Sequence, residues 1–180
     1  MSSLHYDHEG ERDDSRAKEE LRQVVVFSLG EEVFAAPVDI VREILRWQGT
    51  RPVPHAHHSL LGVSTIRGEV IPVIDLAAFL EIEGAVPTDQ KKLIVLEFAT
   101  GQKVGLAVDG VRRIYNIPLD QMDDTLKGTF LGDYLECVIK QEEENILLPD
   151  FEKIVAAFRL ENLRLSRERA EEVGIDAEDK

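Results

Sequence analysis

The stretch from Val24 to Ile44 reads VVVFSLGEEVFAAPVDIVREI, and a stretch on the same plan, IVLEFATGQKVGLAVDGVRRI, runs from Ile94 to Ile114. In both, an apolar, β-branched run leads through a polar turn to a second apolar run, which is the signature of a β-hairpin. The offset of about 70 residues is too long for a solenoid repeat and suits a pair of small β-units. The chain is therefore predicted to contain an internal duplication.

A second hairpin follows in each copy. From Gly62 to Leu76, two runs rich in Val and Ile flank an Arg-Gly-Glu turn, and Leu135–Ile139 with Ile146–Phe151 repeats this plan. Each copy then holds about five strands, and hairpins in that number tend to close into a small barrel that removes exposed edges. The sequence predicts a mainly β fold of two abutting five-stranded β-barrels, one from about residues 24–81 and one from about 93–155.

Short helices are expected beside the strands. Apolar residues at helical spacing in Val38–Leu45 accompany Asp39, a residue type that caps helices, and Leu76–Leu80 is a further helical turn. Near the C-terminal end the apolar positions keep a helical period; they are Phe151, Ile154, Val155 and Phe158. We expect a C-terminal helix that packs on a barrel and then frays in a charged tail at residues 161–180.

Charge and composition narrow the class of protein. The formal net charge of −14 argues against nucleic acid or an anionic membrane surface as the partner. The single cysteine, Cys137, excludes an internal disulfide framework, and the polar N-terminal segment lacks the pattern of a secretory signal. No apolar run approaches the roughly 20 residues that span a bilayer. We expect a soluble, cytoplasmic protein whose residues 1–20 form a disordered acidic arm.

Carboxylates follow the apolar runs at Asp39, Asp75, Asp109 and Asp150. Carboxylates gathered at strand ends could serve metal or acid–base chemistry, but their matching places in both copies favour helix caps and turns, worth about 1 kcal/mol each. No nucleophile elbow and no phosphate-binding Gly-rich loop is recognisable. No catalytic residue and no cofactor is predicted, and the chain is not expected to be an enzyme.

Histidines cluster in a proline-bounded loop, at His55, His57 and His58. Neutral imidazoles can ligate zinc or copper, but no Cys, Asp or Glu nearby completes a ligand set. A metal site is therefore the weaker interpretation, and a polar loop is the stronger one. Trp47 is either an interface anchor or an ordinary half-buried tryptophan.

The turn at Arg67-Gly68 differs from its counterpart in the second copy. Gly68 can supply the positive φ that a tight turn needs, which leaves Arg67 displayed at the tip. The corresponding turn in the second copy, Lys140–Asn145, is acidic and contains neither Arg nor Gly. Because the fold does not require these two residues, they are predicted to serve function.

Short motifs between Val24 and Val155 match those of a known family. They are Val41-x-Glu43-Ile44, Pro52-x-Pro54, Gly62-Val63 followed by Ile66-Arg67-Gly68, Val70-Ile-Pro-Val-Ile-Asp-Leu76, and Val108-Asp109-Gly110-Val111. In these motifs the chain resembles the CheW-like chemotaxis coupling proteins. The resemblance implies two SH3-like barrels in a CheW-like domain at residues 21–160 and no enzymatic activity. It also implies an adaptor that bridges chemoreceptor cytoplasmic tips and the CheA histidine kinase, whose regulatory domain has the same fold.

The resemblance further implies a partner-binding site. Arg67 and Gly68 match the family's signature turn, and Glu43 matches an acid that could pair with Arg67. The family usually has Asn-Leu before Arg-Gly, where this chain has Thr65-Ile66, and this difference can alter the turn or the partner preference. The predicted partner-binding residues are Val41, Glu43, Thr65, Ile66, Arg67 and Gly68.

Other functions stay open at this stage. The same domain could serve another output, such as pili motility or a different chemosensory pathway. A ligand- or metal-binding β-barrel that uses the loop at His55–His58 is a hypothesis of another class. A piece of the kinase itself is disfavoured, because no phosphoacceptor or ATP-binding segment is recognisable.

Overall fold

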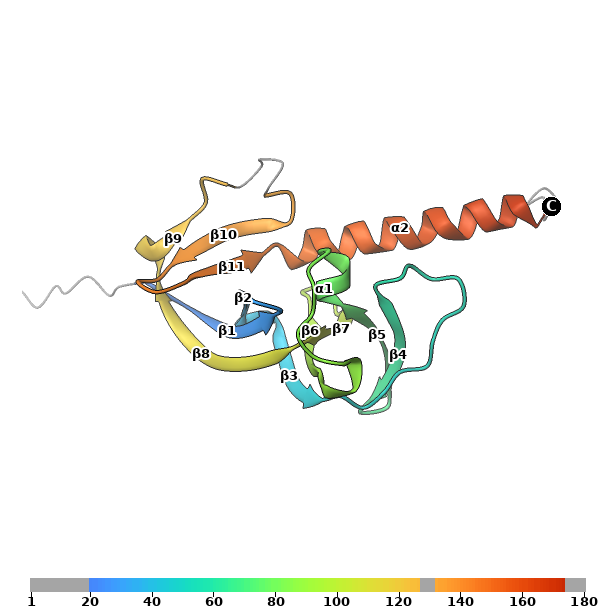
Figure 1. Cartoon of the computed structure of the whole chain (residues 1–180), viewed down its shortest axis with the longest axis horizontal. Coiled ribbons are helices and arrows are strands. Elements are labelled where there is room, and N and C mark those ends of the chain that lie inside the picture. The colour runs from blue at the N-terminus through green and yellow to red at the C-terminus, as the bar shows by residue number, and fades with distance from the viewer. Residues whose placement is uncertain (1–19, 127–131, 174–180) are drawn as a thin grey trace, which may run out of the picture.

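The computed structural model describes residues 20–126 and 132–173 (Figure 1). Two sheets carry the fold. The first has six strands in the order β8 (Gly110–Pro118), β1 (Leu21–Leu29), β2 (Glu32–Pro37), β11 (Asn145–Pro149), β10 (Leu135–Lys140) and the two-residue β9 (Met122–Asp123). The second has five, in the order β3 (Val41–Arg46), β6 (Lys92–Glu97), β7 (Lys103–Val108), β5 (Glu69–Asp75) and β4 (Leu60–Ile66). The predicted mainly β fold with two barrels and a C-terminal helix is confirmed.

The two sequence copies exchange their first hairpins. The β1–β2 hairpin of the first copy lies between β8 and β11 of the second copy, and the β6–β7 hairpin of the second copy lies between β3 and β5 of the first. The joining pairs, β2 with β11 and β5 with β7, are parallel and link strands that are far apart in the sequence. The assignment of one barrel to residues 24–81 and the other to 93–155 is therefore wrong, because local hairpin patterns carry no information on such long-range pairs.

Strand β3 replaces the helix that was expected over Val38–Leu45. Only Val38–Ile40 forms a 3₁₀ turn, η1, and the chain then continues as a strand that pairs with β6. Exposure alternates along β3, with Val41, Glu43 and Leu45 half-buried. The apolar spacing in Val38–Leu45 was compatible with the period of a helix and with that of a strand. Pairing decides in favour of the strand, because β6 would otherwise expose an unpaired edge.

A shared hydrophobic core joins the two sheets. Its buried members come from both, including Phe27 and Phe34 of the first sheet and Leu96 and Leu106 of the second. Each sheet also has a smaller cluster of its own. Because the exchanged hairpins supply the shared core, neither barrel is expected to be independent of the other.

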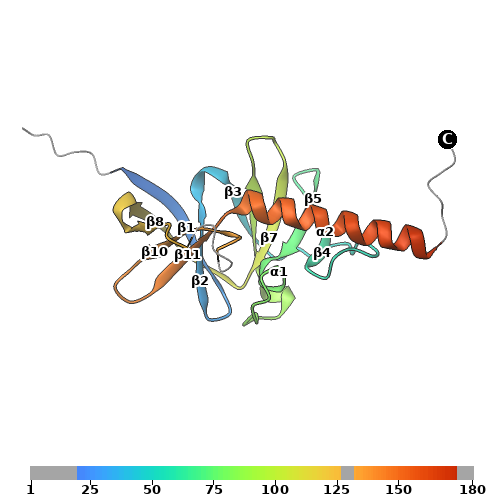
Figure 2. The ribbon, with the colours of Figure 1, turned by 90° about the horizontal axis from the view of Figure 1, so that it is seen from above.

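Helix α2 (Phe151–Glu172) crosses between the two barrels. Its first turns bury Phe151, Ile154, Val155 and Phe158 in the shared core, as the apolar spacing predicted. The helix leaves the end of β11 and runs along the side of the second sheet (Figures 1 and 2). It continues without interruption to Glu172, so the expected loss of helix within residues 161–172 is wrong. Residues 1–19 and 174–180, on which the expected arm and the rest of the tail fall, lie outside the described residues.

The aspartates that follow the apolar runs divide into two groups. Asp75 caps the short helix α1 (Leu76–Phe79) by accepting a hydrogen bond from the Ala78 N–H at 3.2 Å, as expected. Asp150 caps α2 in the same way. Asp39 makes no capping hydrogen bond at η1, and Asp109 instead accepts one from the Nζ of Lys91. The remaining short helices are the 3₁₀ turns η2 (Thr88–Gln90) and η3 (Leu119–Gln121).

The cap of α2 makes a measurable contribution to stability. Asp150 accepts a hydrogen bond from the Lys153 N–H at 3.1 Å, so Asp150→Ala is expected to lower the free energy of unfolding by about 1 kcal/mol. Urea denaturation followed by circular dichroism measures this difference. Asp39→Ala is the matched control and is expected to change stability by less than about 0.5 kcal/mol, since it removes no cap. Equal losses in the two variants would contradict the assignment.

A buried ion pair stabilises the contact between the two sheets, which we call the junction. The Nζ of Lys91 lies 2.8 Å from a carboxylate oxygen of Asp109, and both side chains are almost fully buried, at 4% and 3% exposed. The same carboxylate accepts backbone hydrogen bonds from Gly30 at 2.6 Å and Ala85 at 2.7 Å. One side chain thus ties together the β1–β2 turn, the segment before η2 and the end of β7.

Candidate functional site

The tip of the β4–β5 hairpin displays a cation. Ile66 and Glu69 are the last paired residues, so Arg67 and Gly68 form a two-residue turn. Both have positive φ, +50° at Arg67 and +80° at Gly68, which is the backbone of a type I′ turn. The expected turn is confirmed, and the Arg67 side chain is 75% exposed.

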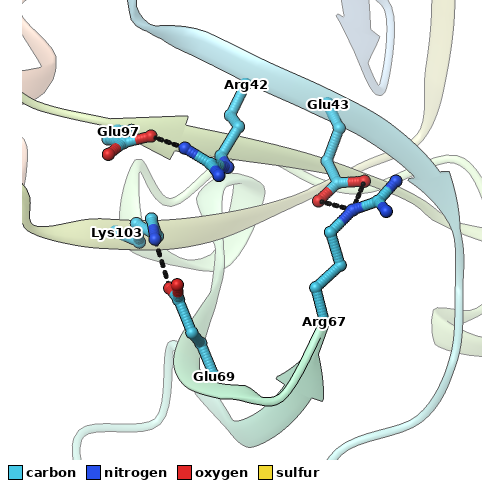
Figure 3. A network of polar contacts seen from close by, with 6 residues as sticks. All are labelled: Arg42, Glu43, Arg67, Glu69, Glu97 and Lys103. Carbon is cyan, nitrogen blue, oxygen red and sulfur yellow. Dashed lines mark hydrogen bonds and ion pairs between the residues drawn. The ribbon is translucent and has the colours of Figure 1, made fainter.

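Arg67 pairs with Glu43 across the end of the barrel that the second sheet forms, which we call the second barrel (Figure 3). The Nε of Arg67 donates to both carboxylate oxygens of Glu43, at 3.1 Å and 3.0 Å. Glu43 is 15% exposed and shares the inner face of β3 with Val41 and Leu45. Because β3 and β4 are the two edge strands of this sheet, the ion pair links its edges. The expected contact between Glu43 and the Arg-Gly turn is present.

Further ion pairs surround this contact and are visible in Figure 3. Arg42 of β3 pairs with Glu97 of β6, and Lys103 of β7 pairs with Glu69 of β5. A hydrogen bond from Lys103, together with its charge, lowers the pKa of Glu69. The hydrogen bond that Arg42 donates to Glu97, together with the charge of Glu97, raises the pKa of Arg42. These groups stay charged near neutral pH. Exposed pairs of this kind add little stability, but they hold charges in fixed positions.

The other predicted site residues divide between surface and interior. Thr65 and Gly68 are exposed beside Arg67. Ile66 is only 5% exposed and packs in the core cluster of the second sheet, so its expected place on the binding surface is wrong. Inward and outward positions alternate along a strand, and Ile66 falls on the inward side. Val41 is half-buried against the shared core, which leaves it little area for a partner.

Sequence reasoning missed exposed apolar residues near this pair. Val70 is 68% exposed and Ile44 is 40% exposed, on the strands that carry Glu69 and Glu43. A groove of about 600 Å³ also borders the hairpin, lined by Gln48, Gly49, Thr50, Arg51, Val63, Ser64, Thr65 and Val70. The signal for Val70 was its position two residues after Gly68, at the start of the strand that follows the exposed turn.

A second groove lies where the two copies meet, and it is mainly apolar. It measures about 410 Å³ and is lined by Phe34, Leu80, Ile82, Leu126, Asp133, Tyr134, Leu135, Leu147 and Pro149. The rings of Phe79 and Tyr134 meet edge to face beside it, with centroids 5.5 Å apart. No local motif could indicate this groove, because its walls come from segments as far apart in the sequence as Phe34 and Pro149.

In the second copy the charges are reversed at the corresponding turn. Strand β8 contributes Arg112, which donates to both carboxylate oxygens of Glu144 in the β10–β11 hairpin, at 3.3 Å and 3.1 Å. In the first copy the strand contributes the acid and the turn contributes the arginine. At the offset of 70 residues Arg112 corresponds to Arg42 and not to Glu43, so the opposite charges at equivalent places are those of the two turns. This difference allows the two barrel ends to favour different partners.

The histidine loop is not arranged to bind a metal. The Nδ1 atom of His55 accepts from Arg169, and the Nδ1 atom of His57 is engaged by Ser59. Within residues 20–126 and 132–173, no three His, Cys, Asp or Glu side chains are grouped to hold a metal ion. The metal interpretation of His55, His57 and His58 gains no support from the geometry. Trp47 is half-buried against the core of the second sheet.

The fold and the site together describe a two-barrel β domain that displays a charged turn and two grooves. Residues 23–159 match the family model described as the CheW-like domain. The chain belongs to the CheW-like domain family. Over the parts of the chain that the structure describes, no helix combines the length and apolar character required to cross a membrane.

Relatives of known name share most of this domain. The chain is 36% identical to the chemotaxis protein CheW of Rhizobium meliloti (strain 1021) over 135 residues, which is 74% of this chain and 86% of that protein. It is 31% identical to the protein FrzA of Myxococcus xanthus over 137 residues, 74% of this chain and 84% of that one. The crystal structure of the scaffolding protein TtCheW from Thermoanaerobacter tengcongensis superimposes with a TM-score of 0.66 and 27% identity, covering 72% of this chain and 89% of that chain.

Proposed function

We propose that this chain is a non-catalytic adaptor that couples chemoreceptors to a CheA-type histidine kinase in the cytoplasm. The observation that carries the proposal is the displayed Arg67, paired with Glu43 at the end of a barrel that lies within the family match. An exposed cation held by a partly buried carboxylate suits a contact that sets orientation and selectivity rather than one that supports the fold.

The grooves suit two different kinds of partner. The apolar groove that includes Phe34, Tyr134 and Leu147 fits the apolar face of an amphipathic helix, such as a receptor tip would offer. The surface around Arg67, with Val70 and Ile44 exposed nearby, combines apolar area with charge, as protein interfaces do. We assign this second surface to the regulatory domain of the kinase.

A reconstitution with purified components tests this function. Membranes containing the receptor are mixed with the kinase, with and without this chain, and are then sedimented. The kinase is expected to sediment with the receptor membranes only when the chain is present. The same fraction of sedimented kinase in both mixtures would refute the proposed coupling.

A related output is the second candidate, favoured by specific relatives. Besides FrzA, the chain is 30% identical to the protein PilI of Pseudomonas aeruginosa over 100 residues, 56% of each chain. These matches support an adaptor for another chemosensory pathway, such as one that controls pili. Co-purification of the tagged chain from its own cells, with mass spectrometry of the bound kinase, separates the two outputs by the identity of the kinase that is recovered.

A further inference from the structure

The loop between β3 and β4 lies against the second half of helix α2. The His57 N–H donates to the Oδ1 of Asn162 at 3.0 Å, and the His57 ring meets the edge of the Phe158 ring with centroids 6.4 Å apart. Arg169, further along the helix, donates to the Nδ1 of His55. We call these contacts the histidine latch. Asn162 and Arg169 lie beyond residue 159, where the match to the family model ends.

The contact of His55 requires a neutral imidazole. An arginine side chain has only hydrogen-bond donors, so the Nδ1 of His55 must accept and its hydrogen must be on Nε2. Protonation of this ring places a hydrogen on Nδ1, directly facing the Arg169 guanidinium. The hydrogen bond is then replaced by contact between two cations.

His57 is also held in its neutral form. Its Nδ1 accepts from the backbone N–H of Ser59 at 3.3 Å and lies 2.7 Å from the Ser59 hydroxyl. Ser59 is fully buried, so protonation of Nδ1 leaves a buried N–H without its acceptor. Burial lowers the pKa of His57 below its usual 6.5, and the charge of His58 lowers it further.

The charged groups of α2 that face His57 largely offset one another. Glu161 raises the pKa of His57 and Arg164 lowers it, and these two side chains form an ion pair at 3.2 Å. The net effect on His57 is therefore set by its burial and by the neighbouring His58.

We propose that the histidine latch is a protonation-sensitive device: neutral His55 and His57 hold the second half of α2 against the β3–β4 loop, and mild acid releases it. The latched state binds fewer protons than the open state, so it is favoured at higher pH. Because the latched fold lowers the pKa of His57 below its usual 6.5, the latched state is progressively lost as the pH falls below that value. The helix begins at β11 of the first sheet, whereas the loop belongs to the second, so release loosens a connection between the two barrels.

Hydrogen exchange of the full chain tests the latch. Exchange is measured by mass spectrometry at about pH 7.5 and about pH 5.5, on either side of the histidine pKa, and corrected for the intrinsic pH dependence of exchange. Protection of amides in residues 160–172 is expected to fall about threefold or more at the lower pH, while protection of β1 and β6 does not change. Unchanged protection of the helix across this range would overturn the proposal.

Two variants separate the latch from general effects of acid. In the double variant His55→Asn with His57→Asn, amide oxygens can accept in place of Nδ1, and asparagine tolerates the positive φ of +64° at position 55. In this variant the amide protection of the helix is expected not to depend on pH, and a fall in protection equal to that of the natural chain would count against the proposal.

In Asn162→Ala the latch is weakened, so the titration midpoint of His57, followed by NMR, is expected to rise toward 6.5. An unchanged midpoint would also overturn it.

Discussion

Replacement of Asp109 by alanine is expected to lower the free energy of unfolding by about 3–5 kcal/mol, because it leaves a buried lysine without its partner. The Lys91 side chain is 4% exposed, and its Nζ lies 2.8 Å from Asp109. The other carboxylate near this Nζ, that of Asp75, is 3.8 Å away and already caps α1. Asp75 therefore cannot compensate for the loss.

Asp109 has partners that Lys91 lacks, so the two single variants are expected to differ. The backbone N–H groups of Gly30 and Ala85 still stabilise the carboxylate after Lys91→Met. Asp109→Ala removes the acceptor of both N–H groups and also leaves the Lys91 ammonium without its partner. The loss is thus expected to be larger for Asp109→Ala than for Lys91→Met, and the reverse order would contradict this account.

The contribution of Asp109 also depends on pH. Burial raises the pKa of this carboxyl, but hydrogen bonds from Ala85, Lys91 and Gly30 outweigh it, and the net effect lowers the pKa below 3.8. A carboxylate whose pKa is lowered by folding stabilises the protein above its unfolded value, and the stabilisation is lost as the pH falls through the folded value. In acid, the stabilities of the natural chain and Asp109→Ala should converge.

Urea unfolding at neutral pH and in acid measures both effects. Glu144→Ala is a suitable control, since it removes one carboxylate from a pair in which Arg112 is 44% exposed. It is expected to cost less than about 1 kcal/mol, as exposed ion pairs do. A loss below that value for Asp109→Ala would show that the buried pair does not hold the junction.

The charge reversal Arg67→Glu is expected to weaken partner binding by about 1–3 kcal/mol, or about 5- to 150-fold in Kd, while the fold stays intact. The new carboxylate faces Glu43, which is 15% exposed, and the displayed cation becomes an anion. Because position 67 is at an exposed tip, repulsion from Glu43 is expected to cost less than about 1 kcal/mol of stability.

The binding measurement needs variants that separate charge from fold. Arg67→Asn creates an Asn-Gly pair, which favours the type I′ turn, so it is expected to keep stability and still lose binding. Arg164→Glu makes the same change in net charge on α2, where the side chain is 65% exposed, and is expected to bind normally. Isothermal titration against the kinase regulatory domain and the receptor fragment gives the three affinities. A folded Arg67→Glu variant with unchanged affinity for both partners would refute the role of the turn.

The local sequence pattern was enough to predict much of the site around Arg67. The turn at Arg67-Gly68 was predictable because only a short polar segment separates two β-branched runs and because glycine tolerates positive φ. The caps at Asp75 and Asp150 followed from the apolar runs around them. The second groove, with Phe34 and Leu147 in its walls, was not predictable, since it exists only after distant strands pair.

The residues whose structure differs from the expectation share one physical property. Val38–Leu45 was expected as a helix, yet pairing with β6 makes Val41–Arg46 a strand. Asp109 was expected as a cap or turn residue, yet the junction supplies it with Lys91. In each case a residue's state depends on a partner far away in the sequence, and composition and spacing do not encode that partner.

By itself, the sequence determined the duplication, the mainly β fold, the charged turn at Arg67 and the start of the C-terminal helix, because each depends on residues within a few positions of one another. Only the tertiary structure decided that the copies exchange hairpins, that Lys91 and Asp109 meet in the interior, and that the histidine loop closes on α2. These features depend on burial and on contacts across the chain, and such contacts form only when the shared core brings the segments together.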